Sequence, residues 1–478
     1  MATASALADI PLAPGHLPVL GHTLPLLRDR LGFLASLPAH GDLLRLRLGS
    51  HTMVMVCEPS LTQAVLRDDR TFDKGGPFYD QAIGIVGDGL ASCPHSRHRR
   101  QRRLCQPAFR SARLPDYIPA MTAAALQTAA GWRDGQVVDI KQAMMALANQ
   151  ILVTTMFGHH LPTQTTRHVT DDTTTLVAGV IRRMMMPAPL DRLPTPGNRR
   201  FRQACARLRR TVADVIADRR SDAGDRHDLL SALLAATEPD ATDSGPQALT
   251  DQELADQVIT FFIAGTETTA GALTWTLYEL ARHPDIQERL HAHTDQVLEG
   301  RPPQDADLPR LTGIDQAFTE ALRLHAPGWL FTRTVTADTT LAGTRLQAGT
   351  TIVFSPYTLH WNPDLHPDPR RFLPGRRQDH PAGRAAYIPF TTGPRQCIAE
   401  RFARQEAAVI LAVLTSTWTF TPVTGQPARL ALSAAATPRE LRLQVHARHS
   451  RPGDRPHHRE GRPDAADPFP PAEPKPLP

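Results

Sequence analysis

One predicted helix constrains the fold of this chain more than any other segment. Apolar residues recur at helical spacing over 254–282, and the pattern ends just before Pro284. Thr250 followed by Glu253 has the spacing of a capping box and marks the start of the helix. About 32 residues at a rise of about 1.5 Å each give a helix roughly 48 Å long. A helix of this length crosses a whole domain, so the other elements have to pack around it.

The middle of this helix lacks the large apolar side chains that a buried helix normally carries. Ala264 and Gly265 form a small pair, and a polar cluster follows at 266–269. In one interpretation the threonine hydroxyls bond back to carbonyl oxygens one turn earlier, and Glu267 lies on a solvated face. In the other, a further group lies directly against the small pair. The helix by itself leaves both interpretations open.

The rest of the chain is predicted to be mainly helical with small sheets, which is an α+β fold. Apolar and polar residues alternate over 42–56 around a Gly-Ser pair, a pattern that predicts a β-hairpin. Helical periodicity dominates over 61–298. Short strands are predicted again over 341–353 and 429–445.

Composition divides the chain into one globular domain, residues 1–446, and a tail. With 41% hydrophobic and 21% charged residues, the chain is neither wholly disordered nor membrane-embedded. Residues 447–478 are rich in proline, arginine and histidine, and nine prolines fall in the last 27 positions. Such a segment buries too little apolar surface to order itself, so we expect a disordered tail.

Cysteine content and the N-terminus indicate a soluble, cytoplasmic protein. Five cysteines, an odd number without Cys-x-x-Cys spacing, argue against a disulfide framework or a zinc site. No apolar run approaches the roughly 18 residues that a membrane span needs. Residues 1–18 lack the cationic and apolar regions of a secretory signal. The 53 basic residues include only three lysines, Lys74, Lys141 and Lys475.

Cys397 is the strongest candidate for a reactive group. It follows a Gly/Pro-rich loop and directly precedes a helical pattern over 400–414. The free N–H groups and the macrodipole of a helix start lower a thiol pKa that is ordinarily about 8.5, which favours a thiolate nucleophile or metal ligand. A nucleophile needs a general base, and no Cys/His pattern lies nearby in the sequence. A buried structural cysteine is the plainer alternative.

This loop resembles the cysteine-ligand loop of the cytochrome P450 superfamily of haem-thiolate monooxygenases, whose pattern is Phe-x-x-Gly-x-Arg-x-Cys-x-Gly/Ala. The fixed positions are met by Phe390, Gly393, Arg395, Cys397 and Ala399. The resemblance covers roughly residues 10–446. It implies a single triangular, mostly helical domain with small β-sheets, in which haem b lies between the long central helix and the Cys397 helix. Cys397 is then the iron ligand.

A second family motif is Glu-x-x-Arg, which Glu320 and Arg323 match. Residues three apart are neighbours on one helix face, but such a pair is common on helix surfaces. In the family the pair is buried and joined by a downstream arginine, here Arg376. Gly375 stands where many members have glutamate. His360, in a segment typical of the family, is expected to be structural.

The resemblance also assigns roles around the haem. Ala264 lets the porphyrin and dioxygen approach the central helix, while Glu267 and Thr268 relay protons to bound oxygen. The haem propionates need polar partners, and guanidinium groups suit carboxylates. The sequence positions that match the family's propionate partners are His98, Arg102, Arg333 and Arg395.

The implied function is insertion of one oxygen atom from O2 into a hydrophobic small molecule. We expect this substrate to be a terpenoid of secondary metabolism. A fatty-acid or polyketide hydroxylase, a peroxide-driven peroxygenase and a non-enzymatic haem-thiolate sensor are the alternatives. The substrate pocket is expected to include apolar residues from several segments: Phe78, Met184 to Met186, Phe261, Phe262, Trp329, Leu330 and Phe331.

Electrons are expected to come from NAD(P)H through a separate ferredoxin and ferredoxin reductase. The chain has no Gly-rich dinucleotide fingerprint and no room after 446 for a flavin or iron–sulfur domain. The donor is predicted to dock behind Cys397, on the basic run 97–103 and Arg404. That run lacks interleaved aromatic residues, which disfavours nucleic-acid binding.

Overall fold

A computed structural model describes residues 7–76, 87–158, 161–184, 193–221, 227–238, 247–376, 383–425, 428–431 and 435–448. Its α-helices are α1 Thr23–Ser36, α2 Pro59–Arg67, α4 His95–Cys105, α5 Leu114–Ala130, α6 Ile140–Phe157, α7 Thr163–Met184, α9 Pro196–Ser221, α10 Leu229–Ala235, α11 Asp251–Arg282, α12 Pro284–Leu298, α13 Thr312–Leu324, α14 Pro356–His360 and α15 Glu400–Thr417. Its 3₁₀ helices are η1 Leu7–Asp9, η2 Leu37–His40, η3 Gln106–Phe109, η5 Asp305–Arg310, η6 Gly383–Ala386 and η7 Gly393–Arg395. Its strands are β1 Leu43–Leu48, β2 His51–Val56, β3 Phe72–Asp73, β4 Val137–Asp139, β5 Thr237–Glu238, β6 Gln247–Ala248, β7 Phe331–Val335, β8 Thr339–Leu341, β9 Thr344–Leu346, β10 Thr351–Phe354, β11 Trp418–Pro422 and β12 Arg442–Ala447.

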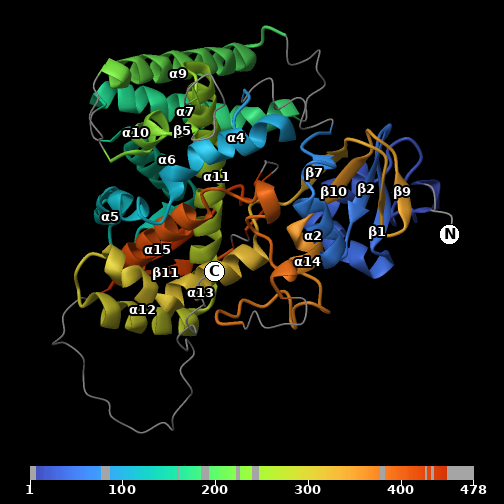
Figure 1. Ribbon diagram of the computed structural model, residues 1–478. Helices are drawn as coiled ribbons and strands as arrows, with labels where there is room; N and C mark the ends of the chain where they lie inside the picture. Colours follow the sequence, from blue (N-terminus) through green and yellow to red (C-terminus); the bar gives the residue numbers. More distant parts are fainter. Residues whose placement is uncertain are drawn as a thin grey trace.

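The long helix α11 organises the helical part of the molecule, as the sequence predicted. It is 32 residues long, and Thr250 and Glu253 form both hydrogen bonds of the capping box. Helices α6, α13 and α15 pack along it, while α7 and α9 cross near its N-terminal half (Figure 1). The helix is buried along most of its length, except around 263–268.

A five-stranded sheet lies to one side of the helical part (Figure 1). Its order is β1-β2-β10-β7-β3, and β1 with β2 forms the predicted antiparallel hairpin. Strand β10 pairs in parallel with β2 and antiparallel with β7. All four residues of β10 are buried, as expected for a central strand. This sheet therefore joins the N-terminal part of the chain to a segment about 300 residues further on.

Helices dominate the described part of 61–298, as the sequence predicted. Four short strands, β3, β4, β5 and β6, with only two or three residues each, also lie in this region. Segments this short show no alternation that a sequence pattern could reveal.

The C-terminal strand extends slightly beyond the predicted domain end at 446. Strand β12 continues through Ala447, and Arg448 pairs with Asp295 of α12 at 2.7 Å. The rest of the predicted tail, from 449 onward, lies outside the described residues.

Two further predictions concern membranes and cysteines. In the part of the chain that the structure describes, no helix has both the length and the apolar character to cross a bilayer. All five cysteines have free thiols.

Candidate active site

The Cys397 loop is held in place by two parts of the chain. Within the loop, the backbone N–H of Cys397 donates to the carbonyl oxygen of Phe390 at 3.0 Å. From outside, α2 packs closely against η7. Gly393 has a positive φ of 75°, and a Cβ there would lie 2.3 Å from the carbonyl oxygen of Leu66. The loop therefore requires glycine at 393 for both its backbone conformation and its contact with α2.

Cys397 lies three residues before the first residue of α15, and its side chain is accessible. The protein around the sulfur nevertheless raises the pKa of the thiol, mainly through desolvation. A hydrogen bond from the Ala399 backbone lowers this pKa but does not compensate. The prediction that the helix start favours the thiolate was therefore wrong for the protein alone. A bound metal ion would take the place of the thiol proton and hold the sulfur as a thiolate.

The middle of α11 presents an accessible face within a buried helix. Ala264 and Thr268, one turn apart, are exposed, whereas Thr266 and Thr269 are buried. The Thr268 hydroxyl donates to the Ala264 carbonyl oxygen at 2.5 Å. A hydroxyl bonded to a carbonyl oxygen one turn earlier is what the first interpretation of this helix predicted. Here, however, the bond lies on an exposed face of the helix. Because the hydroxyl proton is used, the oxygen of Thr268 can still accept a hydrogen bond.

Glu267 directly precedes Thr268 and is less exposed than Ala264 and Thr268. It is half-buried and interacts electrostatically with Lys141, at the start of α6. The negative charge of Glu267 favours the protonated lysine, against a desolvation that lowers the lysine pKa. Glu267 therefore links the solvated start of α6 to the central helix beside Thr268.

Two predicted propionate partners lie on α4. His98 is only 3% exposed, and its pKa falls to about 3, because of burial first and then of nearby Arg395, Lys74 and Arg102. His98 is therefore neutral and can offer an N–H group but not a charge. Arg102, half-buried one turn later, donates to the carbonyl oxygen of Gln396 at 2.7 Å. This bond connects α4 directly to the residue before Cys397.

Arg395 has partners that the sequence did not reveal. Its Nε donates to Asp69 at 2.9 Å, its Nη2 to Asp73 at 2.6 Å and its Nη1 to the Cys93 carbonyl oxygen at 2.8 Å. These three bonds leave two of the five guanidinium N–H groups for another acceptor. Its role as a propionate partner stays a prediction.

Arg333 is buried on β7, where its guanidinium lies 5.4 Å from the ring of Phe354 and donates to the Thr332 carbonyl oxygen. Lys74 lies near it, half-buried, with its amine donating to the carbonyl oxygens of Leu90 and Ala91. The pKa of Lys74 falls to about 7, mainly through burial and then through repulsion from Arg333 and Arg395.

Sequence reasoning missed Lys74 as a site residue. The signal available was its rarity, because it is one of only three lysines beside fifty arginines.

These features fit the haem that the resemblance implies. Haem is flat and has two faces. The accessible cysteine suits one of them, and the exposed face of α11, with its small residues, suits the other. Lys74 and Arg333 repel each other in a largely buried position, and two carboxylates would relieve this repulsion. Cys397 would hold the iron. Lys74, His98, Arg102, Arg333 and Arg395 would supply donors for the propionates.

The Glu-x-x-Arg motif forms the predicted buried pair. Arg323 and Glu320 are joined by two bonds of 2.9 and 2.8 Å. Arg376 completes the group, with its Nε 3.1 Å from Glu320, so its assignment despite Gly375 is confirmed. Arg323 also donates to the His360 carbonyl oxygen.

His360 itself is fully buried and structural, because its Nε2 accepts the Ile388 N–H and its Nδ1 bonds to the Arg323 carbonyl oxygen.

Some expected pocket residues serve the core instead. Phe262 is fully buried and packs against Phe157 at 5.8 Å between ring centres, and Phe261 packs edge-on against Phe109. Phe331 stacks on Phe354, half-buried, as are Trp329 and Leu330. The side chains of Phe78 and Met184 to Met186 lie outside the described residues.

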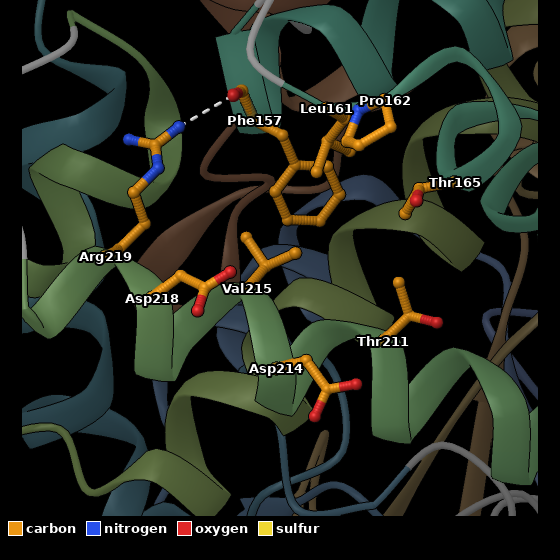
Figure 2. Close-up of a pocket in the computed structure, with 9 residues that line it drawn as sticks. All are labelled: Phe157, Leu161, Pro162, Thr165, Thr211, Asp214, Val215, Asp218 and Arg219. Atoms are coloured by element: carbon orange, nitrogen blue, oxygen red, sulfur yellow. Dashed lines mark hydrogen bonds between the residues drawn. The ribbon is translucent and has the colours of Figure 1, made fainter.

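One cavity of about 370 Å³ is lined by none of the predicted pocket residues. It is lined by Phe157, Leu161, Pro162, Thr165, Thr211, Asp214, Val215, Asp218 and Arg219. Figure 2 shows the Phe157 ring above the α9 residues, with Arg219 donating to the Phe157 carbonyl oxygen. None of the predicted haem or oxygen contacts lines this cavity, so it is not the reaction site.

A second cavity, of about 340 Å³, lies beside α4 and the Cys397 loop. Its lining includes Arg99, Arg102 and Arg103 of α4 together with Gly393. Arg99 and Arg103 are exposed.

Arg404, the other basic residue predicted at this face, is less available for docking. It pairs with Glu400 at 3.3 Å and with Asp315 at 3.4 Å, and these two carboxylates offset its positive charge.

The helical fold, the accessible cysteine behind a glycine loop and the basic groups beside it define a haem-thiolate protein. A profile of the cytochrome P450 family matches residues 11–444. The chain belongs to the cytochrome P450 family. It is a haem-thiolate monooxygenase that uses haem b, O2 and electrons drawn ultimately from NAD(P)H through redox partners.

Several known proteins are similar to this chain. Pentalenene oxygenase of Streptomyces avermitilis is 43% identical over 440 residues, which cover 91% of this chain and 97% of that protein. Cyclooctatin synthase of Streptomyces melanosporofaciens is 41% identical, covering 90% and 94%. Cyclooctat-9-en-7-ol 5-monooxygenase of the same organism is also 41% identical, covering 86% and 90%.

Among solved structures, the haem domain of cytochrome P450DA superposes with a TM-score of 0.80 at 26% identity. The superposition covers 92% of this chain and 98% of that one.

Proposed function

We propose that the protein is a cytoplasmic monooxygenase that hydroxylates or oxidises a polycyclic terpenoid in secondary metabolism. The observation that carries this proposal is the similarity to three relatives, each at least 41% identical over most of the chain. Two are named as oxygenases, of pentalenene and of cyclooctat-9-en-7-ol, and the third as a cyclooctatin synthase, which together support a terpenoid substrate. The half-buried side chains of Trp329, Leu330 and Phe331 offer apolar surface, which suits a substrate without charge.

The haem, when bound, supplies the chemistry that activates dioxygen, and the chain's own residues guide substrate and protons. Ala264 leaves room beside the central helix. Thr268 offers its oxygen as an acceptor on the same face, since its proton is held by the Ala264 carbonyl. Glu267, next in the chain and beside Lys141, can exchange protons with solvent at the start of α6. Together they form a directed proton route to the open face of α11.

Substrate class is tested by optical titration of the haem-loaded protein. Polycyclic terpene hydrocarbons and their monohydroxylated forms are compared with fatty acids and macrolide-like polyketides of similar size. We expect the terpenoids to shift the Soret band at the lowest concentration. Tighter binding of a fatty acid or polyketide would instead assign one of those substrates.

Thr268→Ala is expected to keep haem and substrate binding but to divert electrons into peroxide. Without the hydroxyl, protons reach oxygen in an uncontrolled order, so product formed per NAD(P)H consumed should fall severalfold. Thr266→Ala is the matched control, because its hydroxyl bonds to Phe262 in the core. Unchanged coupling in Thr268→Ala would show that protons arrive by another route.

The same preparations discriminate between the remaining alternatives. A peroxygenase would turn over with hydrogen peroxide as fast as with NAD(P)H and redox partners. A sensor would bind the substrate without product. The accessible Thr268 beside Glu267 favours the O2-dependent enzyme.

We further propose that the electron donor is a ferredoxin, reduced by a ferredoxin reductase, which docks at the α4 cavity. Exposed Arg99 and Arg103 give this face a positive charge that complements an acidic donor. Screening becomes effective beyond about 8 Å at physiological ionic strength, so reduction of the haem should slow as salt rises.

Arg103→Glu should raise the apparent KM for ferredoxin by about tenfold, roughly 1.4 kcal/mol, without changing the substrate-binding spectrum. Arg133→Glu makes the same charge change at an exposed position before β4 and should have little effect. A salt-insensitive rate, or turnover with NADPH and this chain alone, would exclude a separate acidic donor.

A further inference from the structure

Arg395 is held by three separate segments of the chain. Each of its nitrogen atoms donates to one of them: Nε to Asp69, Nη2 to Asp73 and Nη1 to the Cys93 carbonyl oxygen. The guanidinium side chain is only 1% exposed. Because a guanidinium group is planar, three fixed partners determine both its position and its orientation. Arg395 is also two residues from Cys397, so its orientation is set relative to the iron ligand.

The same two aspartates hold the first residue of α4. The backbone N–H of His95 donates to Asp73 at 2.8 Å, and the His95 ring Nδ1 lies 3.2 Å from Asp69. Helix α4 carries His98 and Arg102, the other propionate partners beside the Cys397 loop. Asp69 and Asp73 thus connect α4 to Arg395, although Arg395 lies 326 residues after Asp69.

The two aspartates also offset the positive charge of nearby basic side chains. Arg395, Lys74 and Arg333 place three cationic side chains close together in a largely buried region. Asp69 and Asp73 oppose this charge from within the protein, before any propionate is present. Their carboxylates therefore affect both the orientation of Arg395 and the electric potential at the haem.

We propose that Asp69 and Asp73 are positioning residues for the reaction, which orient Arg395 so that its two remaining N–H groups serve a haem propionate. This inference rests on the haem site of the proposed function. It assigns no contact between the aspartates and the haem itself. It goes beyond that function by making two largely buried carboxylates, linked to α4, responsible for the polar environment of the cofactor.

The test uses the full haem-loaded chain and needs neither substrate nor electron donor. Asp69→Asn and Asp73→Asn are compared with wild type and with Asp68→Asn. Asp68 is the matched control because it is exposed, carries the same charge one residue away and bonds to the Thr71 backbone instead of Arg395. The readouts are the haem midpoint potential, measured with chemical mediators, and the propionate bending bands in resonance Raman spectra.

Asp69→Asn and Asp73→Asn should each raise the midpoint potential, because the positive charge of Arg395 is then less opposed. They should also shift a propionate bending band, since the guanidinium is no longer held. Asp68→Asn should leave the band unchanged and shift the potential less. Asp69→Glu, which restores the charge, should return both readouts toward wild type.

Three results would overturn the proposal. The first is an unchanged propionate band in both asparagine variants. The second is an equal response in Asp68→Asn, which would reduce the effect to long-range charge. The third is failure of both asparagine variants to fold, with the same loss of stability in the haem-free chain. The two aspartates would then be required for the fold and not for the environment of the haem. A failure of the terpenoid or ferredoxin assignment would leave these spectra unaffected.

Discussion

Replacement of Cys397 by alanine is expected to abolish the red-shifted Soret band that the reduced, CO-bound protein gives with a thiolate ligand. Cys397 is an exposed cysteine at the end of the glycine-containing loop that precedes α15. Cys57, Cys93 and Cys105 are buried, and burial raises the pKa of each thiol. None of these three can replace the missing ligand without a rearrangement of the core. The measurement is the optical spectrum after reduction under CO.

The matched control is Cys205→Ala, on α9, which should keep the thiolate band. Haem content is measured in parallel, so that loss of the thiolate band is distinguished from loss of haem. A thiolate band that survives in Cys397→Ala would move the iron ligand to another cysteine. In that case double variants with Cys93→Ala or Cys105→Ala would identify it.

Arg323→Ala should yield almost no haem-loaded protein. Arg323 is 3% exposed in its side chain and forms two bonds to Glu320. It also donates to the carbonyl oxygens of His360, Pro369 and Arg371, which lie on the segment that leads to the Cys397 loop. Removal of one partner from a buried pair costs about 3 to 5 kcal/mol. A loss of that size is comparable with the whole stability of many proteins.

Thermal unfolding and haem content of the purified chain measure this effect. Arg371→Ala is the control, because it removes an exposed arginine from the same segment and leaves the carbonyl that Arg323 binds. Arg323→Lys keeps the charge but not the paired bonds and should fall between the two. Normal stability and haem content in Arg323→Ala would contradict a structural role for the pair.

Local sequence patterns predicted the parts of the structure that depend on neighbouring residues. The capping box of Thr250 and Glu253 fixed the start of α11, and Pro284 its end, because both signals act within one helical turn. The three-residue spacing of Glu320 and Arg323 predicted a pair on one helix face. Arg376 was predicted from the family pattern, and its bond to Glu320 is confirmed.

Contacts between distant segments could not be predicted in this way. The bonds of Arg395 to Asp69 and Asp73 join residues more than 300 positions apart, and no local pattern marks either aspartate. The pKa of Cys397 was predicted in the wrong direction, because desolvation by the folded chain outweighs the helix start. Both features are properties of the tertiary structure and not of the segment that carries the residue.

The order of strands in the five-stranded sheet also sets the order in which the protein can fold. Strand β10 pairs with β2 through Phe354 and Val56, and the loop before Cys397 packs against α2 through Gly393. At a synthesis rate of roughly 5 to 20 residues per second, the N-terminal strands wait about 15 to 60 s for their partner. Contacts of such sequence separation also form slowly in a complete chain. During synthesis the cofactor-binding loop can therefore be assembled only late, and the edge of β2 that pairs with β10 is left without its partner until then.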